Sequence, residues 1–175
     1  MLFRSRRLET PAESRFGVAA DAFVFRREGD LHVAEVAASP ESAVDLFHGL
    51  SNQMPQVVDF AMHCLRSKRR LLGEGLQLTE VREAFSRLRV PLARSGGVEL
   101  AVYTPEEQLA LSPNMNLWIY ARSDRWLYLL LGSGLEETHT LPRRTWSVAA
   151  SEFTGAAALV DEVTAVAGRL TLKVA

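Results

Sequence analysis

The second half of the chain changes from a helical to a strand-like hydrophobic period, and this change constrains the fold most. After Gly96-Gly97, residues Val98, Leu100 and Val102 alternate with less apolar residues, as in a half-buried strand. Similar runs follow around Leu109 and Leu111 and over 117–122, 126–131 and 144–150. Because strands joined by short turns pair antiparallel, the sequence predicts the α+β class and not alternating α/β.

The first half predicts a β-hairpin followed by three helices. AFVFRREGDLHVAEV holds two alternating apolar runs around Glu28-Gly29, where glycine can adopt the positive φ of a tight turn. Ser39-Pro40 predicts a helix start, since serine caps free amides and proline suits the first turn. We interpret 55–73 as a second helix that ends at Gly73. A third helix is expected from a Thr79 cap to Pro91.

A last helix from about Thr154 to Gly168 and a short strand, LTLKV, complete the expected elements. The predicted fold is an antiparallel sheet of about five to seven strands with helices packed on one face. Its expected order is two strands, three helices, four or five strands and one helix. Residues 1–20 are expected to form a loosely ordered arm, and 21–175 a single α+β domain. Pattern alone leaves open whether the 23–36 hairpin joins the main sheet.

Composition argues against two classes of protein. A net charge of −1 and a pI near 6.4 are unlike a dedicated nucleic-acid binder, which is usually strongly basic. No apolar run approaches the roughly 18 residues that a membrane-spanning helix needs. Cys64 is the only cysteine and has apolar neighbours, which is typical of a buried thiol in a reducing compartment. Together with many arginines and few lysines, this favours a bacterial cytoplasmic protein.

The sequence also predicts no metal, cofactor or catalytic group. Its four histidines, His32, His48, His63 and His139, are widely spaced, whereas metal ligands must converge. The segment GSGLEE places Glu137 where a dinucleotide fingerprint needs a third glycine. His63 and Cys64 are adjacent, so on the expected helix their side chains would diverge.

The segment LWIYARSDRWLYLLLGSG, 117–134, is expected to form a hairpin rich in aromatic residues. A two-residue loop at Ser123-Asp124 would place Trp118 and Tyr120 opposite leucines, whereas a three-residue loop would bring four aromatic rings to one face. We favour the shorter loop. Apolar residues crowd both faces in either register, so the hairpin is expected to be central or to face a partner, such as a second copy of the chain.

Basic residues concentrate between 66 and 94, where eight basic and three acidic side chains occur. The run RSKRR at 66–70 would end the second helix, and its charges would complement the helix dipole. The alternative is a patch for an acidic partner, formed by Arg66, Lys68, Arg69, Arg70, Arg82 and Arg89.

These observations favour a non-enzymatic protein-interaction or binding module, with a homodimer as one form of that interaction. The alternative is a small-molecule binding domain or enzyme with a pocket between sheet and helices. That pocket would use Tyr103, Trp118, Tyr120, Arg122 and Trp146, with Arg122 or an arginine from 66–94 holding an acid group. No membrane or nucleic-acid partner is expected.

Overall fold

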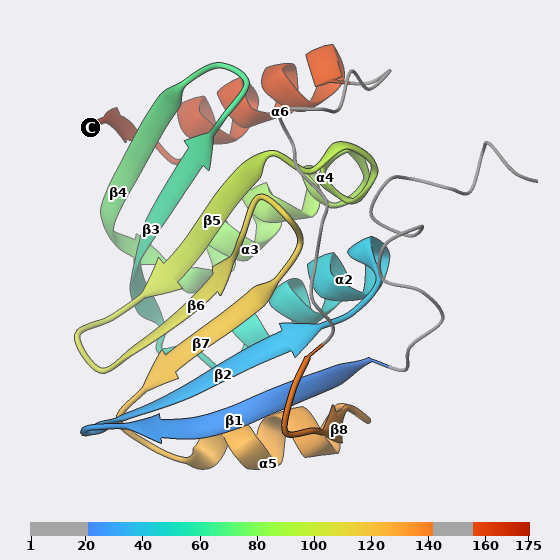
Figure 1. Ribbon diagram of the computed structural model, residues 1–175. Helices are drawn as coiled ribbons and strands as arrows, with labels where there is room; N and C mark the ends of the chain where they lie inside the picture. The colour runs from blue at the N-terminus through green and yellow to red at the C-terminus, as the bar shows by residue number, and fades with distance from the viewer. Residues whose placement is uncertain (1–20, 142–155) are drawn as a thin grey trace, which may run out of the picture.

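The computed structural model describes residues 21–141 and 156–175. In these ranges one mixed sheet is covered by helices on one face (Figure 1). The strands are β1 (Ala22–Glu28), β2 (Leu31–Ala37), β3 (Val57–Cys64), β4 (Arg69–Gln77), β5 (Val98–Tyr103), β6 (Glu107–Leu111), β7 (Leu117–Ala121), β8 (Glu136–Glu137) and β9 (Lys173–Val174). The helices are α2 (Pro40–Ser51), α3 (Leu78–Ser86), α4 (Arg89–Ser95), α5 (Arg125–Gly132) and α6 (Ala156–Arg169).

The strands of the described residues form a nine-stranded sheet in the order β8-β1-β2-β7-β6-β5-β3-β4-β9. All neighbours pair antiparallel except β1 and β8, which are parallel. The α+β class and the mostly antiparallel sheet are therefore confirmed. The sheet is larger than the five to seven strands expected, and the N-terminal hairpin joins it through pairing of β2 with β7.

The pleat divides the side chains between a covered face and an open face, because successive side chains of a strand point in opposite directions. Phe60 on β3, Leu100 on β5 and Ile119 on β7 point to the covered face and are buried in one continuous core. The core continues into the helices, for example at Phe47 of α2 and Val163 of α6. All five helices lie behind the sheet in the view of Figure 1, so the opposite face carries no helix of the described residues.

Several local predictions are confirmed. Gly29 has a φ of +64° in the turn between β1 and β2. The Ser39 hydroxyl accepts a hydrogen bond from the amide of Ser42 and so caps α2, with Pro40 in the first turn. Strand β5 and the final helix α6 also form where the period predicts them.

The predicted helix over 55–73 is wrong. The segment forms most of a hairpin, in which β3 pairs with β4 along almost its whole length. Every second residue of β3 faces the core, so Val58, Phe60, Met62 and Cys64 are all buried on the covered face. Lys68 turns the chain with a φ of +53°. The run RSKRR therefore lies at a hairpin turn and not at a helix end.

The predicted strand over 126–131 is also wrong. The chain leaves β7 at Ala121 and forms α5. In this helix Trp126 and Leu130, four residues apart, point into the core and are fully buried. The question of a two- or three-residue hairpin loop at Ser123 therefore does not arise.

Helix α5 is attached to the sheet by a buried carboxylate. Glu107 of β6 points to the covered face with a side chain only 10% exposed. The indole N–H of Trp126 donates to Glu107 Oε2 at 2.9 Å, and Arg125 Nη2 donates to both carboxylate oxygens at 2.6 and 2.8 Å. Arg125 also donates to the carbonyl of Gln53, just after α2. The network thus joins α5, α2 and β6.

The third predicted helix is split into α3 and α4. Thr79 lies inside α3 and does not cap it, since the helix starts at Leu78 after Gln77. Pro91 lies in the first turn of α4, where a missing amide hydrogen is tolerated. The predicted arm 1–20 and the predicted strand 144–150 lie outside the described residues. No helix within the described ranges is long and apolar enough to span a membrane.

Replacing Trp126 should destabilise the fold strongly. We expect Trp126→Ala to lower the free energy of unfolding by about 3–5 kcal/mol, because it leaves a large cavity and removes a partner of Glu107. Tyr128→Ala is the matched control, since Tyr128 lies on the same helix and is 65% exposed; its effect should stay within about 0.5 kcal/mol. Urea unfolding measures both. Equal losses would contradict the packing of α5 described above.

Candidate functional site

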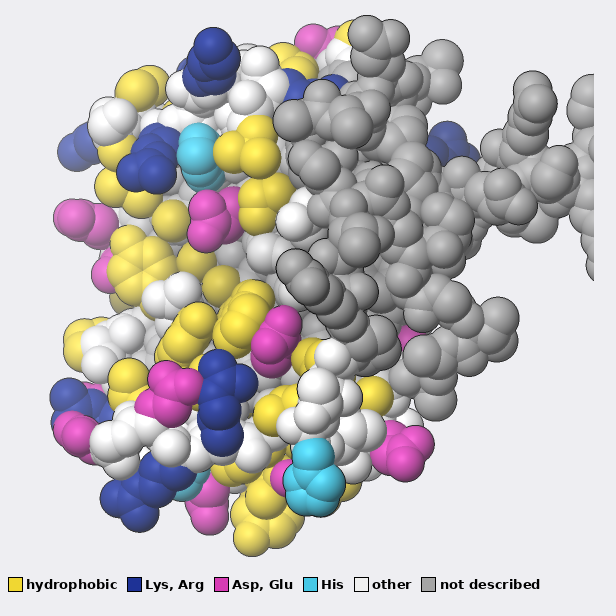
Figure 2. Space-filling model, in the orientation of Figure 1, with side chains coloured by type: hydrophobic (Ala, Val, Ile, Leu, Met, Phe, Trp, Pro, Cys, Tyr) yellow, Lys and Arg dark blue, Asp and Glu magenta, His cyan; other side chains and the backbone are white. Residues whose placement is uncertain are grey.

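The open face of the sheet carries a row of register neighbours that crosses five strands and has three alanines at its centre. Cross-strand register places Leu72 of β4 opposite Ala61 of β3, then Ala101 of β5, Ala110 of β6 and Trp118 of β7. We call this row the trough. Its three alanines lie between a leucine at one end and a tryptophan at the other. Figure 2 views this face from the front and shows a band of hydrophobic side chains beside charged ones.

Two rows of larger side chains border the trough. On one side Tyr103 of β5, Gln108 of β6 and Tyr120 of β7 are register neighbours. On the other side Arg70 of β4, His63 of β3 and Glu99 of β5 are register neighbours. The two rows lie four residues apart along a strand, about 13 Å at a rise of about 3.3 Å per residue.

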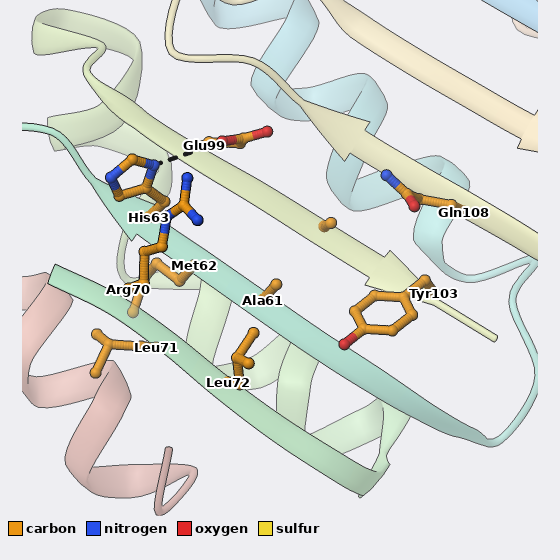
Figure 3. A pocket seen from close by; sticks show the side chains of 10 residues that line it. Ala61, Met62, His63, Arg70, Leu71, Leu72, Glu99, Tyr103 and Gln108 are labelled. Carbon is orange, nitrogen blue, oxygen red and sulfur yellow. Dashed lines mark ion pairs between the residues drawn. The ribbon is translucent and has the colours of Figure 1, made fainter. Parts of the chain in front are cut away.

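Between these rows the surface is hollowed over β4, β3, β5 and β6. The hollow has a volume of about 350 Å³, within the range usual for small-molecule sites. Ala61, Ala101 and Leu72 form its apolar floor. Figure 3 shows Arg70 and His63 side by side at one end, with Tyr103 and Gln108 at the other.

The charged end of the hollow contains one paired and one unpaired basic group. His63 Nδ1 lies 3.7 Å from Glu99 Oε2. Arg70 projects from β4 towards His63 (Figure 3), and its guanidinium forms no ion pair or hydrogen bond with any described residue. This end therefore has a cation available for an anionic group.

The opposite end of the hollow contains neutral hydrogen-bonding groups. Burial raises the pKa of the Tyr103 phenol, and the nearby Asp59 and Glu74 carboxylates raise it further. Tyr103 is therefore protonated at neutral pH and can donate a hydrogen bond. Gln108 adds an amide that can donate and accept.

Aromatic side chains extend the open face beyond the hollow. The rings of Trp118 and Tyr120 stack with centroids 6.1 Å apart and an interplanar angle of 8°. The guanidinium of Arg26 lies 6.0 Å from the centre of the Trp118 ring. Both aromatic residues are half-buried.

The structure brings three predicted ligand-binding residues to one face. All three lie on the open face: Tyr103, Trp118 and Tyr120. The pocket was expected between the sheet and the helices, but core side chains fill that space. Arg122 is exposed and lies 3.2 Å from Glu106 in an ion pair. Trp146 lies outside the described residues.

The predicted acidic-partner patch is divided between two locations. Arg66, Lys68, Arg69 and Arg70 lie in or beside the turn of the β3–β4 hairpin. Arg82 donates to Ser51, Asn52 and the carbonyl of His48. Arg89 pairs with Asp45. The last two arginines therefore hold α3 and α4 against α2, and of the six only Arg70 lines the hollow.

Sequence patterns alone did not identify His63, Glu99 and Gln108 as residues that line one hollow. A helix over 55–73 would place Asp59 and His63 on a solvated stripe, far from the strand that carries Glu99. The signal was the alternation from Val58 to Cys64, where every second residue is apolar and the intervening Asp59, Ala61 and His63 are polar or small.

Other features of the described residues provide less specific chemistry. No group of His, Cys, Asp and Glu there could hold a metal ion, and Cys64 is buried. Three further hollows, of 390 to 700 Å³, lie among the helices and at the β4–β9 edge, and no aromatic residue lines them. Comparison of the chain with known protein families, curated proteins and solved structures found no match.

His48 of α2 should make stability depend on pH. Burial lowers its pKa below the usual 6.5, and the charges of Arg82 and Arg89 lower it further, against an opposite effect of Asp45. Well above pH 6.5 the imidazole is neutral in both folded and unfolded chains. Below that pH the unfolded chain binds the proton first, so the folded state loses stability until the pH falls below the folded-state pKa.

We therefore expect His48→Gln to lose less stability than the unmodified protein between pH 7.5 and pH 5.5. His139→Gln, which replaces an exposed histidine, should retain the full loss. Chemical unfolding at each pH gives the comparison. A pH dependence unchanged by His48→Gln would show that this residue is not responsible.

Proposed function

We propose that this protein is a non-enzymatic binding module that holds its ligand in the hollow on the open face of the sheet. The observation that carries the proposal is the convergence of an apolar floor, an unpaired Arg70 and two polar groups, Tyr103 and Gln108, at one concave place. An apolar cavity with a few polar groups that orient a ligand is the usual design of a binding site.

The lining residues favour binding over catalysis. His63 and Glu99 form a pair that could move a proton. However, the described residues that line the hollow include no serine, threonine, cysteine or lysine to act as a nucleophile beside them. Cys64 lies on the same strand but points to the opposite face, into the core. As part of this proposal, the reduced and buried thiol fits a cytoplasmic protein, and the arginine-rich composition fits a bacterial one.

We expect that a larger side chain on the floor of the hollow weakens ligand binding. Alanines labelled with ¹³C at the methyl group report on a titration with 3-(4-hydroxyphenyl)propanoate and 4-methylphenol. We expect the signals of Ala61 and Ala101 to shift, and those of the fully buried Ala34 and Ala84 to stay. Ala101→Leu should weaken binding about tenfold or more, because the added atoms occupy the space of the ligand.

The matched control is Ala165→Leu, the same change at an exposed position of α6, and it should leave the titration unchanged. The proposal would be overturned if neither compound shifted Ala61 and Ala101. It would equally fail if Ala101→Leu and Ala165→Leu bound alike.

Self-association through the open face is the second candidate. The stacked Trp118 and Tyr120 lie on this face outside the hollow, and aromatic residues are enriched at protein interfaces. Sedimentation analysis at high concentration should then show a dimer that Trp118→Glu dissociates and Tyr128→Glu does not. A monomer at every concentration would eliminate this candidate and leave the ligand-binding proposal intact.

A further inference from the structure

We infer that the hollow binds a small aromatic acid with a single carboxylate, held by Arg70 at one end and by Tyr103 and Gln108 at the other. This inference rests on the proposed function, because it specifies the ligand of the same site. It follows from the charge, the length and the shape of the hollow.

The charge of the hollow selects one negative group. Among the described lining residues, Arg70 is the arginine or lysine whose side chain forms no ion pair, and Glu99 is instead paired with His63. An arginine fork matches a carboxylate, which can accept two parallel hydrogen bonds. Glu99 would repel a second negative charge, as on a phosphate dianion, so a monoanion fits best.

The floor of the hollow favours a flat, apolar body. Ala61 and Ala101 are register neighbours with no side chain beyond a methyl group, and Leu72 continues the surface at the β4 side. A planar ring can therefore lie against the sheet between the two rows. Larger side chains border it on both sides (Figure 3).

The length of the hollow indicates a polar group at the far end of the ligand. The row of Arg70 and the row of Tyr103 are about 13 Å apart at their backbones. The Tyr103 ring extends over the hollow from one end, whereas Arg70 lies beside His63 at the other (Figure 3). The remaining space matches one ring with a short acid chain. The phenol of Tyr103 and the amide of Gln108 would then meet a hydroxyl or carbonyl on the ring.

Three related compounds test each end separately. They are 3-(4-hydroxyphenyl)propanoate, the corresponding uncharged amide 3-(4-hydroxyphenyl)propanamide, and 3-phenylpropanoate, which lacks the ring hydroxyl. Dissociation constants come from the methyl signals of Ala61 and Ala101. For the unmodified protein we expect the hydroxy acid to bind about five- to tenfold more tightly than the amide, because hydrogen bonds to a charged group exceed neutral ones.

Arg70→Gln should remove this preference, so that acid and amide bind within about twofold of each other. Arg70 is exposed, so the substitution should leave the fold unchanged. Arg94→Gln, at an exposed arginine of α4, is the matched control and should keep the preference. Raising the salt concentration should reduce the preference, since solvent ions screen an exposed charge.

Tyr103→Phe tests the other end. It should reduce the advantage of the hydroxy acid over 3-phenylpropanoate, whereas Tyr128→Phe should not. The inference is overturned if acid and amide bind the unmodified protein equally at a site that Ala101→Leu blocks; the proposed function then stands. If no compound binds at a site that Ala101→Leu blocks, both the inference and the proposed function fail.

Discussion

The carboxylate of Glu107 lies nearly buried beneath the sheet, and the surrounding architecture depends on how it is held. Arg125 and Trp126 bind it from α5, while Arg125 also reaches the carbonyl of Gln53 after α2. The Arg125 side chain is 40% exposed, so solvent screens the ion pair, but the nearly buried Glu107 carboxylate loses its hydrogen-bond donors if α5 leaves the covered face. The chain after β7 is thereby directed under the sheet, and it does not continue as a strand across the front.

With the helices on one side, the pleat determines the chemistry of the other. Each strand must give its apolar residues to the core, so the alternate positions are free for polar, aromatic or small side chains. On β3, β5 and β6 these positions hold Ala61, Ala101 and Ala110, and the flanking positions hold larger groups. A concave site on a sheet follows from this size pattern alone. Because Arg70 lies at one end of this site, its charge would orient a bound anionic ligand.

The sequence predicted those parts of the fold that short-range rules determine, such as the turn at Gly29 and the cap at Ser39. It failed where tertiary contacts overrode the local pattern. The run from Trp126 to Leu131 is apolar enough for a strand, but a helix lets Trp126 reach Glu107, 19 positions earlier in the chain. Similarly, the pattern of 55–73 is compatible with a helix or a strand. The strand β3 within it pairs with β5, whose residues are far away in the sequence. His63 and Glu99 become neighbours only through that pairing. Tyr103, Trp118 and Tyr120 were predicted as ligand-binding residues from residue type alone.

The most direct test of a binding surface on the open face is the position of a bound probe. Nuclear Overhauser effects between bound 3-(4-hydroxyphenyl)propanoate and methyl-labelled protein would locate it. The account predicts contacts from the ring protons to the methyl groups of Ala61 and Ala101, and none to the core methyl groups of Ala34 and Ala84. Contacts to the core alanines, which would place the probe between sheet and helices, would contradict it.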